Sequence, residues 1–291
     1  AIREKALGPE HPDVGLSLNN LAELSREQGH YAKAEPLFRR SLGIYEKALG
    51  PEHPHVGASL NNLAGLYNAQ GRYAEAERLY RRSLTIAEKA LGPAHRNVGL
   101  SLNNLAGLYN AQGRHAEAEP LYRRSLMIAE KALGLEHPDI GLSLNNLAGL
   151  YYAQGRNAEA EPLFRRSLGI YEKALGPEHP LVGASLNSLA GLYYAQGRYA
   201  EAEPLFRRSL TIAEKALGPE HPDVGHPLNN LALLYTAGGR HAEAERLYRR
   251  TLSINEKALG PDHPSLGTTL GNLAYLYRQQ KRWDEGLGLA R

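Results

Sequence analysis

A 42-residue repeat is the feature that most constrains how this chain can fold. The segment 101–113 reads SLNNLAGLYNAQG. Near copies begin 42 residues apart at residues 17, 59, 143 and 185, and altered copies begin at 227 and 269. Repetition at a period of about 20 to 50 residues is typical of stacked units that contact only their neighbours. The 291 residues therefore predict a single repeat domain over 1–291, and not separate globular domains.

Each repeat contains two segments with helical periodicity. In the second repeat, residues 54–70 and residues 73–91 both place apolar side chains on one helical stripe. We call these two segments the A helix and the B helix of a repeat. Gly71 is expected in the left-handed conformation after the A helix, and Gly92 with Pro93 ends the B helix. The predicted fold class is all-α, an α-solenoid of stacked antiparallel helix pairs.

The repeat phase predicts where each helix pair lies. Full pairs are expected at 12–49, 54–91, 96–133, 138–175, 180–217 and 222–259. A partial B helix at 1–7 and a truncated last repeat at 264–291 complete the array. Four prolines lie about five residues into B helices, where only one backbone hydrogen bond is at stake. The B helices should therefore continue through Pro36, Pro120, Pro162 and Pro204.

Two places in the array are expected to depart from the repeat. Pro227 replaces a serine about six residues into an A helix, so that helix should start late or bend.

The segments 1–7 and 283–291 should each expose a stacking face. Because 51–92 and 93–134 differ at only seven of 42 positions, these faces should partly match each other. Weak head-to-tail self-association is the expected result.

Composition and charge exclude several function classes. A formal net charge of +3 is too small to indicate nucleic-acid binding, although pairs such as Arg39 and Arg40 recur. Glu35 lies four residues before Arg39, a repeated spacing that favours ion pairs on a solvated helix face. The absence of Cys suits a reducing compartment or one where cysteine is simply unused, and a cytoplasmic location is expected. No apolar run approaches the roughly 18 residues of a membrane span.

The recurring histidines and serines are expected to be structural. Each repeat has one such His, as at His53 before Pro54. Neighbouring imidazoles are separated by the width of a helix pair, about 10 Å for each helix, which is too far for them to share a metal ion. Such a His is better explained as a loop residue before a proline at the first helical position. An active site normally needs one unique constellation, whereas Ser, His and Glu recur here at the same offsets. The chain is therefore predicted to be no enzyme and to hold no metal or cofactor.

One family shares this pattern of small and aromatic residues. In the second repeat the pattern comprises Asn62, Leu63, Ala64, Gly65, Leu66, Tyr67, Gly71, Tyr73, Ala76, Tyr80 and Ser83. It resembles the tetratricopeptide repeat (TPR). The additional segment TIAEKALG and the recurring LNNLA and HP resemble the 42-residue repeats of kinesin light chains and their bacterial relatives. The resemblance implies a TPR-like right-handed superhelix with A helices on the concave side, and peptide or protein binding without catalysis.

The resemblance does not extend to two known ligand sites. The positions that resemble the TPR clamp for C-terminal carboxylates hold Asn61, Gly65 and Asn62 here, so that clamp is not expected. The acidic and aromatic peptide cargo of kinesin light chains is not transferred either, because the A helices offer few cations.

A binding groove is expected on the A-helix face opposite the apolar stripe. In the second repeat this face holds Ala58, Asn62, Gly65 and Ala69. The predicted peptide-binding residues are Asn20, Asn61, Asn62, Gly65, Asn68, Leu100, Asn103, Asn104, Gly107, Asn110, Leu142, Asn145, Asn146, Gly149, Tyr152, Gly191, Tyr194 and Asn230. Glycine within a helix costs about 1 kcal/mol relative to Ala. Crowding inside a curved stack and a groove floor open to a ligand backbone both explain glycine at position 65.

The predicted function is partner binding by a non-enzymatic scaffold. Its partner would be a peptide or helix of a protein, held in the concave groove. A structural or self-assembling solenoid, or the sensor arm of a larger signalling protein, are the alternatives. No residue pattern names the ligand.

Overall fold

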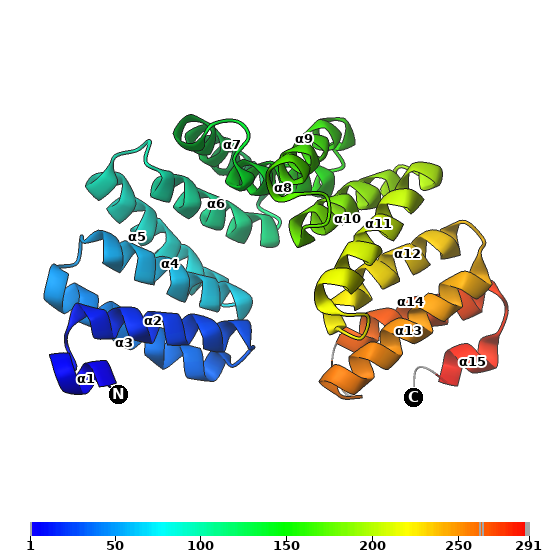
Figure 1. Cartoon of the computed structure of the whole chain (residues 1–291), viewed down its shortest axis with the longest axis horizontal. Coiled ribbons are helices and arrows are strands. Elements are labelled where there is room, and N and C mark those ends of the chain that lie inside the picture. The colour runs from blue at the N-terminus through cyan, green and yellow to red at the C-terminus, as the bar shows by residue number, and fades with distance from the viewer. Residues whose placement is uncertain (1, 262, 264, 289–291) are drawn as a thin grey trace. The chain divides into compact units, whose positions relative to one another are not determined.

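The structure is a computed structural model that describes residues 2–261, 263 and 265–288. The chain divides into two compact units, Ala1–Leu150 and Tyr151–Arg291. The described residues of both units contain helices and turns and no strand. In each unit, A and B helices alternate along the chain and pack in antiparallel pairs (Figure 1). The predicted all-α class of stacked helix pairs is confirmed, and the single domain over 1–291 stays a prediction.

The first unit opens with the short helix α1 (Ile2–Leu7). Its A helices are α2 (Pro12–Glu27), α4 (Pro54–Ala69) and α6 (Arg96–Ala111). Its B helices are α3 (Tyr31–Leu49), α5 (Tyr73–Leu91) and α7 (His115–Leu133). The boundary between the units falls within the A helix α8 (Pro138–Ala153).

The second unit continues the same alternation. Its B helices are α9 (Asn157–Leu175), α11 (Tyr199–Leu217) and α13 (His241–Leu259). Its A helices are α10 (Pro180–Ala195), α12 (Gly225–Ala237), which follows the 3-10 turn η1 (Pro222–Val224), and α14 (Ser265–Gln279). The last described helix is α15 (Trp283–Gly288). Residues 264 and 289–291 of the predicted truncated repeat lie outside the described residues.

Helix ends follow local backbone rules that repeat along the chain. Gly71 after α4 has φ 73° and Gly92 after α5 has φ 85°, so both occupy the left-handed region that favours glycine. At the start of α4, Nδ1 of His53 accepts the backbone N–H of His55 at 3.2 Å, which makes His53 the N-cap. Equivalent His caps precede α2, α6, α10 and η1. The B helices also continue through Pro36, Pro120, Pro162 and Pro204.

Within a repeat, a glycine and a serine hold the A and B helices close together. The hydroxyl of Ser83, buried in α5, donates to the carbonyl oxygen of Gly57 in α4 at 2.7 Å. A Cβ added at Gly57 would lie 3.3 Å from Cγ2 of Ile86, which is tighter than most packed contacts. The backbones approach this closely because position 57 carries no side chain. Ser83 is buried in the interface, which agrees with the structural role expected for the recurring serines, and its hydrogen bond is an added finding.

Between repeats, a buried cluster joins the B helix of one pair to the helices of the next. In the first unit, Tyr45 of α3 packs with Val56 and Leu60 of α4 and with Ile86 of α5. In the second unit the equivalent cluster contains Tyr171, Val182, Leu186 and Ile212. Burial of apolar side chains at such junctions stabilises by roughly 1.5 to 3 kcal/mol per residue. Stacking thus supplies the core that one helix pair lacks.

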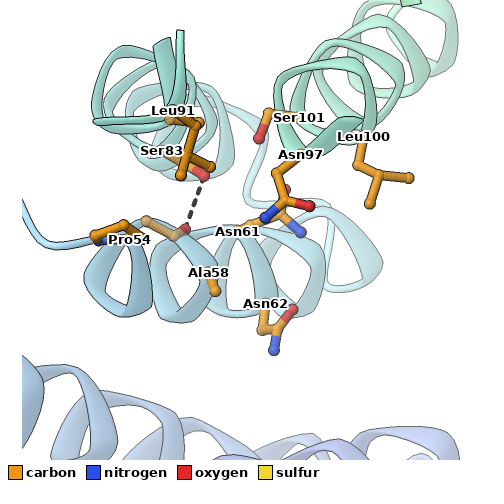
Figure 2. Close-up of a pocket in the computed structure, with 11 residues that line it drawn as sticks. Pro54, Ala58, Asn61, Asn62, Ser83, Leu91, Asn97, Leu100 and Ser101 are labelled. Atoms are coloured by element: carbon orange, nitrogen blue, oxygen red, sulfur yellow. Dashed lines mark hydrogen bonds between the residues drawn. The ribbon is translucent and has the colours of Figure 1, made fainter. Parts of the chain in front are cut away.

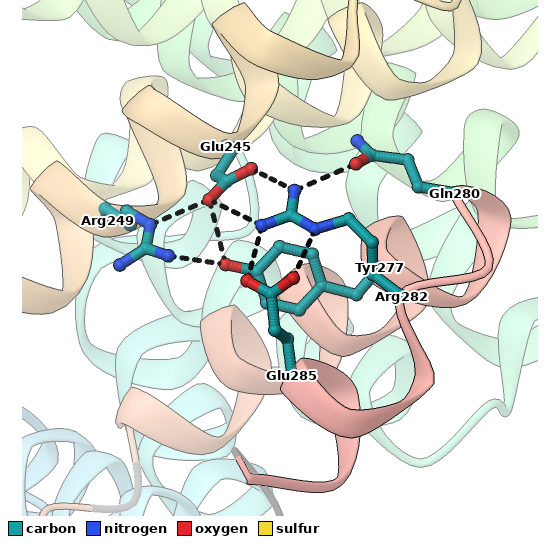
Figure 3. A network of polar contacts seen from close by, with 6 residues as sticks. All are labelled: Glu245, Arg249, Tyr277, Gln280, Arg282 and Glu285. Carbon is teal, nitrogen blue, oxygen red and sulfur yellow. Dashed lines mark hydrogen bonds and ion pairs between the residues drawn. The ribbon is translucent and has the colours of Figure 1, made fainter.

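A polar network reinforces the same junctions (Figure 3). Glu245 of α13 accepts hydrogen bonds from Tyr277 of α14 at 3.0 Å and from Nη1 of Arg282 at 2.6 Å. The guanidinium of Arg282 also binds Glu285 and lies 4.3 Å from the ring centroid of Tyr277. Arg249 lies four residues after Glu245, and its Nε donates to Oε1 of Glu245 at 2.9 Å. The predicted helical ion pair is therefore present. We call this arrangement the junction clamp.

Related junction clamps recur at a constant spacing. The carboxylate stays 32 residues before the tyrosine and 37 before the arginine. The clamp carboxylates with these printed contacts are Glu35, Glu77, Glu161, Glu203 and Glu245.

Pro227 changes the start of its A helix as predicted. In α10, the α-helix begins at Pro180, directly after the His cap. In the repeat that contains Pro227, residues 222–224 form a 3-10 turn and the α-helix begins only at Gly225. Pro227 itself is buried. Because proline has no N–H and its ring crowds the preceding turn, the first turn tightens instead of forming an α-turn.

Replacing Pro227 by serine, the residue found at position 185, should raise the free energy of unfolding by about 1 kcal/mol. The gain arises because an α-turn and one backbone hydrogen bond can form. Urea unfolding checks the stability, and amide hydrogen exchange checks whether Gly225 becomes protected. Lower stability of the serine variant would show that the stiffening of the unfolded chain by proline outweighs the lost bond.

Candidate functional site

A pocket lies between the A helices of successive repeats and the B helix between them. In the first unit it has a volume of about 200 Å³ and lies among α4, α5 and α6. Figure 2 shows Ala58 and Asn61 of α4, Ser83 of α5 and Asn97 and Leu100 of α6 around it. The pocket exists because the small residues on α4 and α5 leave space where the next A helix begins.

The same pocket recurs twice in the second unit. One copy, of about 360 Å³, lies among α10, α11 and the η1–α12 segment. The other, of about 380 Å³, lies among η1–α12, α13 and α14. Equivalent positions line all three copies, as shown by Asn61, Asn187 and Asn229. The A-helix face therefore carries a repeated hollow at junctions within both units.

The predicted asparagines form bridges between neighbouring A helices. Nδ2 of Asn104 donates to Oδ1 of Asn61 at 3.0 Å, and Nδ2 of Asn146 donates to Oδ1 of Asn103 at 3.0 Å. The same bond, across 43 residues, joins Asn62 to Asn19, Asn230 to Asn187 and Asn272 to Asn229. One amide N–H of each donor asparagine is thus used by the fold. These side chains are half-buried, so they also have a structural role that the sequence did not reveal.

Two predicted asparagines differ from this pattern. Asn20 is exposed on α2 and has no preceding A helix among the described residues. Oδ1 of Asn145 is buried without a hydrogen-bond partner among the described residues. The residue 43 positions after Asn145 is Ser188, where other repeats have the donor asparagine.

The predicted glycines line open space and not a crowded interface. A Cβ at Gly65 or Gly107 would meet only a tyrosine hydroxyl at 3.5 Å, an ordinary contact. A Cβ at Gly149 or Gly191 would meet nothing within 4 Å. At these four glycines, the described residues therefore leave room for a larger side chain. The close helix contact occurs instead at the glycine eight residues earlier, as at Gly57.

The remaining predicted residues supply an apolar and aromatic surface. Leu100 and Leu142 are each 47% exposed, and Tyr152 is 40% exposed. In the second unit, the ring of Tyr194 tilts against that of Tyr199 with centroids 5.7 Å apart.

Two further predicted asparagines lie near the ends of A helices. Oδ1 of Asn110 lies 3.1 Å from Nδ1 of His115, and Asn68 is half-buried at the end of α4.

The A helices carry few charges, whereas the B helices carry many. The helices α4, α10 and α12 contain no Asp, Glu, Lys or Arg. The helix α5 alone contains Glu75, Glu77, Arg78, Arg81 and Arg82. Hydrogen bonds from the clamp arginines lower the pKa of Glu77, Glu161 and Glu245, as Arg114 does at Glu77. Charge is therefore placed at the junctions and on B helices, and the A-helix face is left almost neutral.

Sequence reasoning missed the part of the pocket that comes from B helices. Ser83, Ala87 and Leu91 of α5 line it beside the A-helix residues. Their small size at helical spacing was a usable signal, but it indicated packing within a repeat. Among the described residues, no group of three or more His, Asp or Glu side chains could hold a metal ion, and no helix is both long and apolar enough to cross a membrane.

Comparisons with known proteins agree with this architecture. The family model of the tetratricopeptide repeat matches residues 1–47, 19–89, 55–131, 97–173, 139–215, 182–257 and 223–287. The structure of a kinesin light chain with nearly identical TPR-like repeats from Podosopora anserina is similar, with 34% identity and a TM-score of 0.60. The match covers 71% of this chain and 97% of that chain. Comparison with curated proteins finds no match.

Two more distant structures share the fold. BtubC from P. vanneervenii has 24% identity and a TM-score of 0.63, covering 83% of this chain and 94% of that chain. A signal-transduction ATPase with a tetratricopeptide repeat sensor, from Pyrococcus horikoshii, has 19% identity and a TM-score of 0.69. That match covers 95% of this chain and 41% of the ATPase. From the repeat period, the helix pairs and these matches, the chain belongs to the tetratricopeptide repeat family, in its 42-residue, kinesin-light-chain-like form.

Proposed function

We propose that this chain is a non-enzymatic scaffold whose A-helix face binds a segment of a partner protein. TPR proteins are generally protein-interaction scaffolds, and nothing in the described residues points to catalysis. The observation that carries the proposal is the repeated pocket on a nearly uncharged face. Beside the first-unit pocket this face also exposes Leu100, an apolar side chain that a face meeting only solvent would not need.

The composition of this face favours a largely apolar segment with exposed backbone. Open positions such as Gly191 let a ligand backbone approach, and asparagines such as Asn62 keep one N–H for a ligand after bridging to Asn19. Apolar contacts from Leu100 and Leu142 supply the area that is removed from water on binding. A cytoplasmic location, end-to-end stacking of copies and a role as the sensor arm of a larger protein stay predictions.

A peptide-display selection tests the proposal. Peptides selected from a random library should bind the unmodified chain and lose at least about tenfold in affinity when Leu100 and Leu142 are replaced by Asp. The loss follows because two charges replace apolar contact area at the proposed site. Binding constants are measured by calorimetry or fluorescence anisotropy.

Met127→Asp is the matched control. Met127 is 62% exposed on the B helix α7, so its replacement introduces an aspartate on a different face. This variant should bind the selected peptides as the unmodified chain does. Selected peptides that are lost on Met127→Asp and kept on the double leucine variant would place binding on the B helices and contradict the proposal.

A further inference from the structure

The pocket among η1–α12, α13 and α14 differs in chemistry from its counterpart in the first unit. Three polar residues, His226, Asn255 and Thr268, stand where the first-unit pocket has Ala58, Ala87 and Leu100. Lining positions that are the same in both copies include Pro54, Gly57 and Leu91 of the first-unit pocket, which correspond to Pro222, Gly225 and Leu259. The backbone frame is therefore the same, and the polar groups are additions to it. We call this copy the polar pocket.

Asn255 supplies a buried hydrogen-bond acceptor that the fold does not use. The residue is only 7% exposed, and its Oδ1 has no hydrogen-bond partner among the described residues. The side-chain amide lies against Gly225, where an added Cβ would come within 3.4 Å of Oδ1. An unpaired buried amide costs roughly 1 to 3 kcal/mol. Asn255 and Gly225 both line the polar pocket, so this unused acceptor lies in the pocket wall.

Other lining groups can also accept hydrogen bonds. The hydroxyl of Thr251 donates its proton to the carbonyl oxygen of Leu247 at 3.0 Å, so it can only accept from a ligand. Oδ1 of Asn229 accepts from Asn272 at 3.2 Å and retains a second lone pair. No Lys or Arg lines the polar pocket. Its polar groups are thus suited to a ligand that donates several hydrogen bonds.

Asp223 adds a negative charge that no Lys or Arg offsets. No Lys or Arg of the described chain lies within ion-pair distance of its carboxylate. Nδ1 of the neighbouring His221 accepts the backbone N–H of Asp223 as the helix cap. In the first unit, Asp139 at an equivalent position pairs instead with Arg96 at 2.5 Å, whereas Asp13 lies beside its His cap as Asp223 does. The carboxylate of Asp223, which is largely exposed, is therefore available to an external cation.

We propose that the polar pocket binds a cationic side chain, the guanidinium of an arginine or the ammonium of a lysine. A guanidinium carries five N–H donors and an ammonium three, and neither accepts, so both match the acceptor oxygens of Asn229, Thr251 and Asn255 and the carboxylate of Asp223. The donor side chain would belong to the partner segment on the A-helix face. That part of the proposal rests on the function proposed above, whereas binding of the side chain itself does not.

Titration with N-acetyl-arginine methylamide and N-acetyl-lysine methylamide tests the pocket directly. The unmodified chain is followed by NMR at the side-chain amide of Asn255 and the methyl groups of Thr251 and Thr268, at a fixed pH of about 8. Saturable shifts with a millimolar dissociation constant are expected from at least one of the two compounds. N-acetyl-citrulline methylamide, which has the shape of arginine without its charge, should bind at least about tenfold more weakly.

Two variants assign the binding to the proposed groups. Asp223→Asn and Asn255→Ala should each weaken binding of the cationic compound by about fivefold or more. Alanine occupies the position equivalent to 255 at Ala87, so the fold accepts it there. Asn255→Ala should also unfold at a higher urea concentration than the unmodified chain, because an unpaired amide is removed.

Three results would overturn the inference. They are no saturable shift with either cationic compound, equal binding of citrulline, and unchanged binding in Asp223→Asn. None of them would affect the peptide selection, so failure of the polar pocket is distinguishable from failure of the A-helix face.

Discussion

Replacing Gly183 by valine should lower the free energy of unfolding by about 3 kcal/mol. A Cβ at Gly183 in α10 would lie 3.1 Å from Cγ2 and 3.4 Å from Cβ of Ile212 in α11, and the methyl groups of valine add to this overlap. Isoleucine is branched at Cβ and has few alternative rotamers in a helix. The two helices must therefore move apart, which also loosens the cluster around Leu186. Urea unfolding followed by circular dichroism measures the loss.

Gly191→Ala in the same helix is the matched control. Its Cβ would meet nothing within 4 Å, and its backbone is helical, so only the helix preference of alanine over glycine acts. This variant should gain up to about 1 kcal/mol. If both substitutions destabilised the chain to a similar extent, the contrast between a packed glycine at 183 and an open glycine at 191 would be wrong.

Acidification should also lower the free energy of unfolding, because it removes the stabilisation that the junction clamps provide. Hydrogen bonds from Arg114, Arg198 and Arg282 hold the pKa of Glu77, Glu161 and Glu245 below the ordinary value of 4.5. Each carboxylate thus binds its proton more weakly in the folded chain than in the unfolded one. Its stabilisation is complete above the unfolded value and is lost as the pH falls through the lowered pKa. We expect a loss of about 1 to 2 kcal/mol per clamp, measured by urea unfolding from pH 7 to 3.

A variant with glutamine at 77, 161 and 245 is the control for the acid effect. Glutamine retains hydrogen-bonding capacity and does not titrate, so the variant should be less stable at neutral pH and show a flatter dependence below pH 4.5. An identical acid profile in the variant and the unmodified chain would assign acid unfolding to other carboxylates.

The sequence was sufficient to predict the helices because periodicity and breakers agree in most repeats. Gly71 and Gly92 mark helix ends through a backbone conformation that other residues rarely adopt. Pro227 marks an irregular start for a reason that is local to one turn. These predictions depend on neighbours within about five residues along the chain, and such contacts can be read from spacing alone.

Contacts between repeats were harder to predict because they depend on how pairs stack. The spacing from Glu77 to Arg81 indicated a helical ion pair, which is present. The same carboxylate also binds Tyr109 and Arg114 of the next repeat, 32 and 37 residues away. Likewise, the sequence placed asparagines such as Asn104 on the A-helix face but could not show the bond to Asn61.

The glycines show the same limit at the level of a single face. Gly57 and Gly65 lie in one helix and both recur, yet only the first is required by a close approach between helices. Sequence periodicity assigns each to a face but does not give the distance to the partner helix. The sequence could therefore assign residues to a face of the A helices, while the pocket and its polar version in the second unit required the structure.

The constant spacing of the junction clamp has a consequence for how such a chain can evolve. In the clamps described above, one repeat supplies the carboxylate and the next repeat supplies the tyrosine and the arginine, as Glu77 binds Tyr109 and Arg114. Unequal recombination that adds or removes a whole repeat therefore joins faces that already match. Copy number can change without any new interface having to arise. Residues such as Asn255, which take no part in the clamp, can meanwhile diverge and give one copy its own ligand preference.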